Sequence, residues 1–250
     1  MWMIASDIDG TLTGDVAALE MLAQAVVGFR RGGGRFVLVT GRSYGQTLHG
    51  LAEEGLPMPD AVITQVGTEI YLPPFLPDAA PLASWDARLR AEFDRQEACA
   101  FVDSGAGWVL QGGAGNTPLK ASWWYQGTAD PEAAAAAVVA AVAASGRPYR
   151  VVWSSGQDLD ILPASAGKAR AVEHVAQHFG VSQSACVVAG DTGNDLDMIG
   201  HFPHAVVVAN ARSELLDWAR AHPRPGLHVA TADHAAGVLE GLRALGVPLA

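Results

Sequence analysis

Short apolar segments alternate with amphipathic helical segments through the first 64 residues, and this alternation constrains the fold more than any other feature. Residues 2–8 and 36–39 are apolar runs of strand length, and residues 16–31 between them carry apolar side chains at helical spacing. A second helical pattern at 44–54 leads to another apolar run at 61–64. Two successive strand–helix–strand units favour parallel strands with right-handed crossovers. The sequence therefore predicts an α/β fold with a doubly wound, Rossmann-like parallel sheet.

The same alternation resumes in the last third of the chain, but the segment before it has a different order of expected helices and strands. Apolar strands are expected at 185–189 and 205–208, with helices before, between and after them. In the middle segment, a helix at 84–96 is followed by strand patterns, an alanine-rich helix and further strands. This order of elements predicts a smaller α+β domain inserted into the first. We expect a core of residues 1–80 and 165–250 and an inserted cap, or lid, of residues 81–164.

Composition and charge narrow the class of partners. Half of the 250 residues are apolar and 17% are charged, which is typical of a compact chain rather than a disordered one. The formal charge of −10 argues against nucleic-acid binding, which needs clustered basic side chains. Asp7 and Asp9 interrupt the apolar run that a signal peptide would need. We therefore expect a cytoplasmic protein with neither a nucleic-acid nor a membrane partner, and a monomer by default.

Two acids stand where the first strand should end, at the start of the segment DIDGT. In extended chain, alternate side chains share a face, so Asp7 and Asp9 can point at one bound group while Ile8 turns into the sheet. Gly10 permits a sharp turn and a close backbone approach. Ligands of open α/β sheets bind beyond the carboxyl ends of the strands. The alternatives are a solvated turn and a calcium loop, and for the calcium loop the remaining EF-hand ligands are missing at their spacing.

A second acidic segment, GDTGND, follows a later strand at residues 190–195. A helix cap would explain Asp195 but not Asp191 as well. Hard oxygen ligands from two separate strand ends suit Mg²⁺, which takes one or two protein carboxylates and keeps waters and substrate phosphate as its other ligands. The sequence therefore predicts a magnesium site between Asp7 and Asp191.

Two further positions favour a bound phosphate. Thr40 and the backbone at Gly41 and Arg42 follow the second strand, where a hydroxyl and free N–H groups can hold phosphoryl oxygens. A simple strand-to-helix turn is the alternative. Lys168 opens a helix directly after the inserted segment. Most lysines are exposed on the surface, and only its position makes Lys168 a candidate for the phosphate site.

Together these residues resemble the four ordered motifs of the haloacid dehalogenase-like phosphatases. Within that superfamily, residues 40–43 (TGRS), 66–71 (VGTEIY) and 158–163 (DLDILP) are similar to the sucrose-phosphate phosphatases and their relatives. This resemblance implies that the insert is a cap of the Cof-type or C2B kind. Ala169 follows Lys168 where relatives usually have glycine.

A carboxylate is an established phosphoryl acceptor, so Asp7 is the expected nucleophile and an aspartyl-phosphate the expected intermediate. The resemblance implies that Asp9 acts as general acid and then base, while its backbone carbonyl helps to hold the metal. The expected groups are catalytic residues Asp7, Asp9, Thr40 and Lys168, and Mg²⁺ ligands Asp7, Asp9, Asp191 and Asp195.

The cap is expected to choose the substrate, because a core that recognises only phosphate and metal cannot distinguish leaving groups. The candidate substrate contacts are Gly41, Arg42, Glu69, Lys120, Gln157, Asp158 and Asn194. Four tryptophans fall in predicted cap strands, and packing inside the cap is the expectation for all of them, with stacking of one on a sugar ring as the alternative. They are Trp108, Trp123, Trp124 and Trp153.

The expected activity is magnesium-dependent hydrolysis of a small phosphorylated metabolite, preferably a sucrose-phosphate-like disaccharide or other glycosyl phosphate. A mannosyl- or glucosyl-3-phosphoglycerate is the closest alternative substrate. A phosphohexomutase is a rival, because that fold also begins with an Asp-x-Asp-Gly-Thr motif. A catalytically silent sugar-phosphate sensor is a rival of another class, since fold and binding do not prove turnover.

Overall fold

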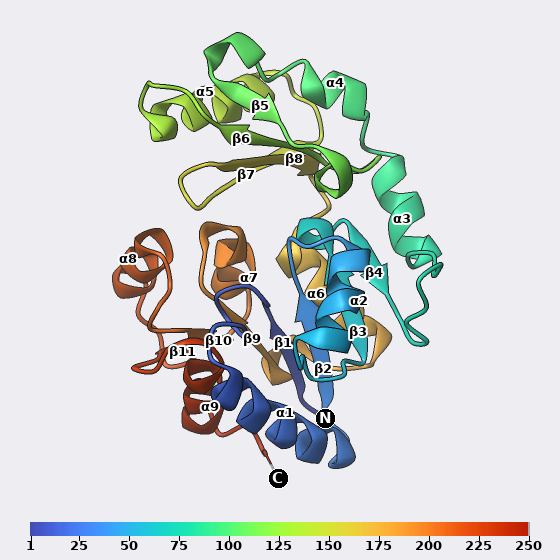
Figure 1. The fold of residues 1–250 in the computed structure, drawn as a ribbon, viewed down its shortest axis with the longest axis vertical. Coiled ribbons are helices and arrows are strands. Elements are labelled where there is room, and N and C mark those ends of the chain that lie inside the picture. The colour runs from blue at the N-terminus through green and yellow to red at the C-terminus, as the bar shows by residue number, and fades with distance from the viewer. Residues whose placement is uncertain (250) are drawn as a thin grey trace.

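The computed structural model describes residues 1–249 and contains two β-sheets (Figure 1). The larger sheet consists of β1 (Met3–Ser6), β2 (Arg35–Val39), β3 (Ala61–Thr64), β4 (Glu69–Tyr71), β9 (Cys186–Gly190), β10 (His204–Val207) and β11 (Leu227–Val229). Its strand order is β11-β10-β9-β1-β2-β3-β4, and every pair is parallel except β3 with β4. The doubly wound parallel sheet expected from the sequence is confirmed.

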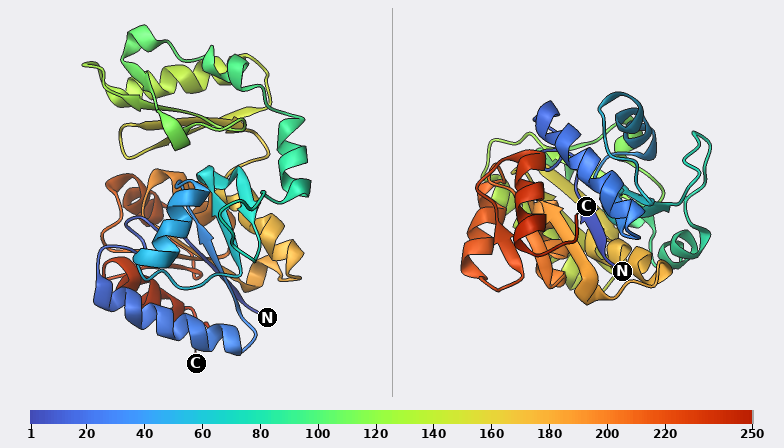
Figure 2. Two further views of the ribbon diagram at one scale, coloured as in Figure 1. Left: turned by 45° about the vertical axis from the view of Figure 1, so that its right-hand side comes forward. Right: turned by 90° about the horizontal axis from the view of Figure 1, so that it is seen from below.

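Helices cover both faces of this sheet (Figure 2). They are α1 (Val16–Arg31), α2 (Tyr44–Glu53), α6 (Lys168–His178), α7 (Leu196–His201), α8 (Ser213–Ala221) and α9 (His234–Ala244). Helices α1 and α9 contact each other on one face, and α6 and α7 contact each other on the opposite face. The Asp15 side chain caps the first turn of α1, whose buried stripe includes Leu19, Leu22 and Val26. No helix in residues 1–249 is both long and apolar enough to cross a membrane.

The chain leaves the central strand β1 in one direction and later returns to its other side. Strands β2 and β3 extend the sheet on one side of β1, whereas β9 and β10 extend it on the other. The carboxyl ends of β1 and β9 therefore form a topological switch point, where open α/β sheets bind their ligands. Asp7 follows β1 directly and Asp191 follows β9 directly.

The second sheet is antiparallel and lies over the carboxyl edge of the first (Figure 1). Its strands, in the order β5-β6-β8-β7, are β5 (Trp108–Leu110), β6 (Ala121–Tyr125), β7 (Tyr149–Ser154) and β8 (Asp158–Pro163). Helices α4 (Arg95–Cys99) and α5 (Pro131–Ala144) lie on the side away from the core. This is the expected α+β cap, inserted between β4 and α6.

The cap has an apolar cluster of its own on the side covered by α5. Trp108, Trp123, Leu159 and Ile161 are at most 4% exposed there. The expectation that all four cap tryptophans pack in this way was wrong for Trp124, which is 40% exposed. The reason is the alternation along β6, which turns Trp123 toward α5 and Trp124 toward the core.

Two other elements differ from the sequence pattern. The helix expected at 84–96 is two helices, α3 (Ala83–Arg90) and α4, because Asp94 accepts a hydrogen bond from the Glu97 amide and starts a new helix. Trp85 and Leu89 of α3 pack in the large core cluster, and Trp85 Nε1 donates to the Gly67 carbonyl at 3.2 Å, so α3 contacts the core directly. Strand β4 was not predicted, because its three residues owe their conformation to pairing with β3.

Candidate active site

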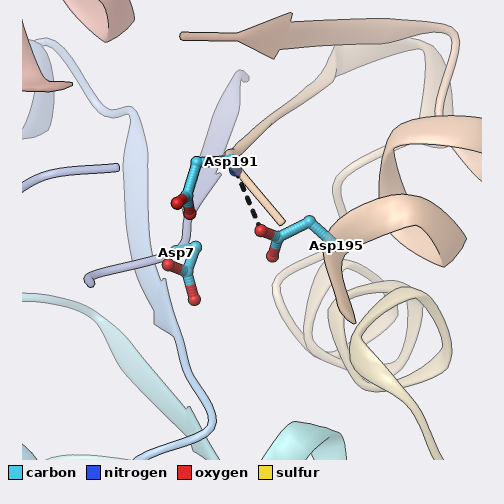
Figure 3. Close-up of side chains that lie close together, drawn as sticks. All are labelled: Asp7, Asp191 and Asp195. Carbon is cyan, nitrogen blue, oxygen red and sulfur yellow. Dashed lines mark hydrogen bonds between the residues drawn. The ribbon is translucent and has the colours of Figure 1, made fainter. Parts of the chain in front are cut away.

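Three buried carboxylates meet at the switch point (Figure 3). Asp7, Asp191 and Asp195 each offer an oxygen within 4.8 Å of the others. Asp195 reaches the site from η5 (Gly193–Asp195), a single 3₁₀ turn after β9, and accepts the Asp191 amide at 3.0 Å. Segments separated by more than 180 residues of sequence therefore supply one cluster.

Lys168 is fully buried at the first position of α6 and joins two of these acids. Its Nζ donates to Asp7 Oδ1 at 2.6 Å and to Asp195 Oδ1 at 2.7 Å. Burial alone lowers the pKa of Lys168, but the charges of Asp195 and Asp7 outweigh burial and raise it. Lys168 is therefore a permanent cation at this site. Unlike most lysines, Lys168 is therefore not on the surface.

The charges of the cluster fit a divalent cation. With the acids ionised, as metal ligands are, three carboxylates and one ammonium would leave two net negative charges for a divalent cation to balance. Burial raises the pKa of Asp7 well above its usual value despite Lys168, and burial followed by the charge of Asp195 raises the pKa of Asp191 to about 7. Burial is the largest cause of both shifts, and a bound cation would favour the ionised carboxylates that burial disfavours. Hard carboxylate oxygens around it are the donor set that Mg²⁺ prefers.

Asp9 has a different environment from Asp7. Its side chain is 59% exposed and lies outside the three-carboxylate cluster. Arg42 grips it in a fork, with Nε 2.9 Å from Asp9 Oδ2 and Nη2 2.6 Å from Asp9 Oδ1, and also binds Glu54. These hydrogen bonds, which Arg42 donates to Asp9, raise the pKa of Arg42. The structure thus places Arg42 on the candidate acid–base group, although the sequence pattern suggested a phosphate contact.

The backbone that follows Asp7 lies close to Asp191, one of the candidate metal ligands. Gly10 has φ +79°, and a Cβ there would come within 2.3 Å of Asp191 Oδ2, so only glycine fits. Thr11 donates its hydroxyl to Asp191 Oδ1 at 2.9 Å. Thr40 accepts the Arg42 amide at 3.1 Å, which leaves its own hydroxyl proton free for a phosphoryl oxygen.

A cavity of about 320 Å³ lies between the core and the cap. Gly41 and Arg42 line it from the core, and Lys120 and Trp124 line it from the cap. Lys120 is buried and lies 3.5 Å from Asp160. The structure therefore brings three of the predicted substrate contacts, Gly41, Arg42 and Lys120, to one cavity.

The other predicted contacts are more dispersed. Glu69 accepts hydrogen bonds from Thr64 and Tyr71 and does not line the cavity. Gln157 is exposed in the β7–β8 turn. Asp158 accepts Gln111 Nε2 at 3.2 Å on the cap sheet. Asn194 lies in η5, where its Oδ1 is buried without a partner in the described structure. This oxygen could accept a hydrogen bond from a substrate.

The sequence pattern missed several residues at the site. Gln111, Asp160 and Glu54 contact predicted site residues, and Trp124 was assigned to packing. Asp160 had a signal, because it alternates with Asp158 along one strand and must share its face. Gln111 and Glu54 had none, since their partners are distant in sequence.

A doubly wound core with an aspartate directly after its central strand, covered by an inserted cap, defines a haloacid dehalogenase-like phosphatase. The family described as sucrose-6F-phosphate phosphohydrolase matches residues 1–246, and the chain belongs to this family of sugar phosphatases. It is therefore an enzyme, a phosphoric monoester hydrolase.

Three relatives illustrate the similarity. A mannosylfructose-phosphate phosphatase of Agrobacterium fabrum is 32% identical and covers 98% of this chain and 97% of its own length. Sucrose-phosphatase 1 of Nicotiana tabacum is 31% identical over 96% of the chain, which spans 58% of that longer protein. The sucrose-phosphatase of Synechocystis sp. PCC6803, solved with sucrose and phosphate, has a TM-score of 0.90 at 31% identity, with 98% of both chains covered. A subclass IIB sugar phosphatase shares the fold, with a TM-score of 0.65.

Proposed function

We propose that this phosphatase hydrolyses a disaccharide phosphate in a Mg²⁺-dependent reaction that passes through an aspartyl-phosphate on Asp7. The observation that carries the proposal is the buried contact between Asp7 and Lys168 beside Asp191 and Asp195. Lys168 occupies Asp7 Oδ1 and leaves the other carboxylate oxygen free to attack phosphorus. Asp7, Asp191 and Asp195 would hold Mg²⁺, with the Asp9 carbonyl as a further ligand, and the ion would neutralise phosphoryl oxygens.

In the first half-reaction, a carboxylate oxygen of Asp7 forms a bond to phosphorus, and the bond from phosphorus to the sugar oxygen breaks. The electron pair stays on the sugar oxygen, which takes a proton from Asp9. Water then attacks phosphorus, Asp9 accepts the proton of that water, and the bond between Asp7 and phosphorus breaks. One group thus serves as acid and then as base.

Arg42 constrains this role of Asp9. The Arg42 guanidinium donates to both carboxylate oxygens of Asp9 and so occupies the two atoms that could carry a proton to the sugar. Asp9 must therefore leave the fork before it can donate a proton to the sugar oxygen. Substrate entering the cavity beside Arg42 supplies competing acceptors for the guanidinium, and Glu54 remains as its second partner.

The substrate class rests on the relatives. Two of them are named for sucrose phosphate and for mannosylfructose phosphate, both phosphorylated disaccharides with a fructose unit. The cavity between core and cap, at about 320 Å³, falls in the range of small-molecule sites. Mannosyl- and glucosyl-3-phosphoglycerate are the alternative substrates, and a panel of phosphorylated sugars distinguishes them by kcat/KM.

Replacement of Asp7 by Asn tests the proposal. The amide is isosteric but not nucleophilic, so turnover of sucrose 6F-phosphate should fall by at least ~10³-fold. Release of inorganic phosphate is the measurement, and retained folding of the variant is checked by its melting temperature. Substantial residual turnover in Asp7→Asn would refute the assigned nucleophile.

Chelation and product analysis complete the test. EDTA should stop phosphate release, and added Mg²⁺ should restore it. Free phosphate with dephosphorylated sugar supports hydrolysis, whereas phosphate retained on the sugar would indicate a mutase. Absence of phosphate release from every phosphorylated sugar would support the sensor instead.

A further inference from the structure

Trp124 has no structural role that explains its position. Trp123 and Trp108 are 4% and 3% exposed in the cap cluster, whereas Trp124 is 40% exposed. Trp124 belongs to neither that cluster nor the core cluster among the described residues. An indole that is left half in water on a sheet facing the core contributes little to folding.

Across the strands of the cap sheet, Trp124 has one apolar and one acidic neighbour on the same face. Register pairs Trp124 with Val109 on β5 and with Asp158 on β8. The next row along pairs Ser122 with Asp160, and the two are hydrogen bonded. These partners hold two carboxylates at fixed positions next to the indole. Burial, followed by the charge of Asp160, raises the pKa of Asp158.

Trp124 faces residues of the catalytic core across one cavity. Trp124, Gln111 and Lys120 line the cavity of about 320 Å³ together with Gly41 and Arg42. Gln111 donates to Asp158 and Lys120 lies beside Asp160, so polar side chains around the cavity connect to both acids. Arg42 in turn grips Asp9. Arg42 therefore links the acid–base candidate Asp9 to the cavity that Trp124 lines.

A sugar ring matches this combination of groups. Its C–H face is apolar and its edge carries hydroxyls, so it needs a flat apolar surface beside fixed donors and acceptors. An indole supplies a large rigid surface, and the neighbouring carboxylates, amide and ammonium supply hydroxyl partners. We propose that Trp124 is the stacking platform for a sugar ring of the leaving group. It thereby selects ring-bearing phosphate esters over acyclic ones, an inference that rests on the proposed phosphatase function.

The test compares two substrates in Trp124→Ala. For sucrose 6F-phosphate, KM should rise ~10-fold or more with kcat little changed, since aromatic contacts contribute on the order of 1.5 kcal/mol. For glycerol 2-phosphate, which has no ring, kcat/KM should stay within about twofold of the wild type because Trp124 touches only the leaving group. Trp124→Phe should restore most of the affinity. Equal losses on both substrates, or an unchanged KM for the sugar phosphate, would overturn the proposal.

Leu110→Ala is the matched control. Leu110 is also a large apolar side chain on the cap, 48% exposed, but its register partner is Trp123, so it lies on the opposite face. This variant should leave both substrates unchanged. An increase in KM for the sugar phosphate equal to that of Trp124→Ala would show a general effect of cap truncation and would overturn the platform.

Binding of dephosphorylated product separates this proposal from the proposed function. Calorimetry with sucrose and with mannosylfructose requires no turnover and can be done in Asp7→Asn. At least one of them should bind, and Trp124→Ala should weaken that binding ~10-fold. If neither disaccharide binds, or if binding is indifferent to Trp124, the platform is refuted whatever the phosphatase assay shows. Retained binding without phosphate release would refute only the hydrolytic function.

Discussion

Lys168 is the residue on which the charge balance of the active site depends. It is fully buried between Asp7 and Asp195, at 2.6 and 2.7 Å. A buried cation with two carboxylate partners stabilises both, and its loss leaves charged oxygens without a donor. The same contact holds Asp7 in one orientation. Stability and catalysis therefore share this residue.

Replacement of Lys168 by Met should reveal both roles. Without Mg²⁺, the free energy of unfolding at pH 7 should fall by about 3 kcal/mol, because carboxylates stay buried without their cation. Added Mg²⁺ should recover part of this loss through the same carboxylates. Turnover should fall at least ~100-fold, as expected for removal of a preorganised charge. Denaturant unfolding with and without Mg²⁺ measures the first effect, and wild-type stability in this variant would contradict it.

At the scale of elements, Asp60 joins three pieces of the core. It accepts Arg30 of α1 at 2.9 Å, the Phe36 amide of β2 at 3.0 Å and Arg35 at 3.0 Å, directly before β3. Burial alone raises the pKa of Asp60, but the bonds from Arg30 and the Phe36 amide outweigh it and lower the pKa below its usual value. The carboxylate thus fixes the crossover from α1 into the sheet.

This lowered pKa gives a pH-dependent prediction. Because the pKa of Asp60 is lower in the folded chain than in the unfolded chain, its stabilisation is complete above about pH 4 and is lost as pH falls through the folded value. Asp60→Asn should therefore cost about 2 kcal/mol of unfolding free energy at pH 7. The gap to the wild type should narrow below about pH 4. Chemical denaturation across this range is the measurement, and a gap that stays constant with pH would count against the ion-pair origin.

The helices and strands themselves were largely predictable. The first helix and the third strand have the bounds that the apolar spacing gave, 16–31 and 61–64. These elements repeat one local pattern over their full length, so spacing alone identifies them. The errors fall where a partner decides: β4 exists through pairing with β3, and the expected helix at 84–96 is interrupted where Asp94 caps a new one.

At the level of the whole molecule, residues of the C-terminal third hydrogen-bond to the loop that contains Asp9 and Gly10. Asn210 Nδ2 donates to the Gly10 carbonyl at 2.7 Å, and His234 Nδ1 lies 2.9 Å from the same oxygen, so its proton resides on Nδ1. Asn210 also accepts the His234 amide at 2.8 Å. The loop between Asp9 and Thr11 is therefore held by residues 200 or more positions away.

Removal of this contact should affect catalysis more than the fold. Asn210→Ala should lower kcat ~10-fold, because a displaced Gly10 moves its neighbour Asp9, and should cost about 1 kcal/mol of stability. Steady-state kinetics and thermal unfolding measure the two effects. As a control, Asp217→Ala removes an exposed side chain of α8 whose ion pair with Arg220 is solvent-exposed, and it should change neither. An unaltered kcat in Asn210→Ala would show that the loop needs no such support.

Local spacing is enough to predict the repeating strand–helix pattern, the inserted cap and the positions of the acids at strand ends. The order of the motifs also indicates that Asp7, Asp191 and Lys168 belong to one group. Which charges face each other depends instead on contacts between distant segments: Arg42 meets Asp9, and Lys168 is buried between two acids. The same kind of contact puts Trp124 at the cavity rather than in the cap interior. Spacing fixes the face of a strand on which a side chain lies, but what that face meets depends on the docking of two sheets from distant parts of the chain.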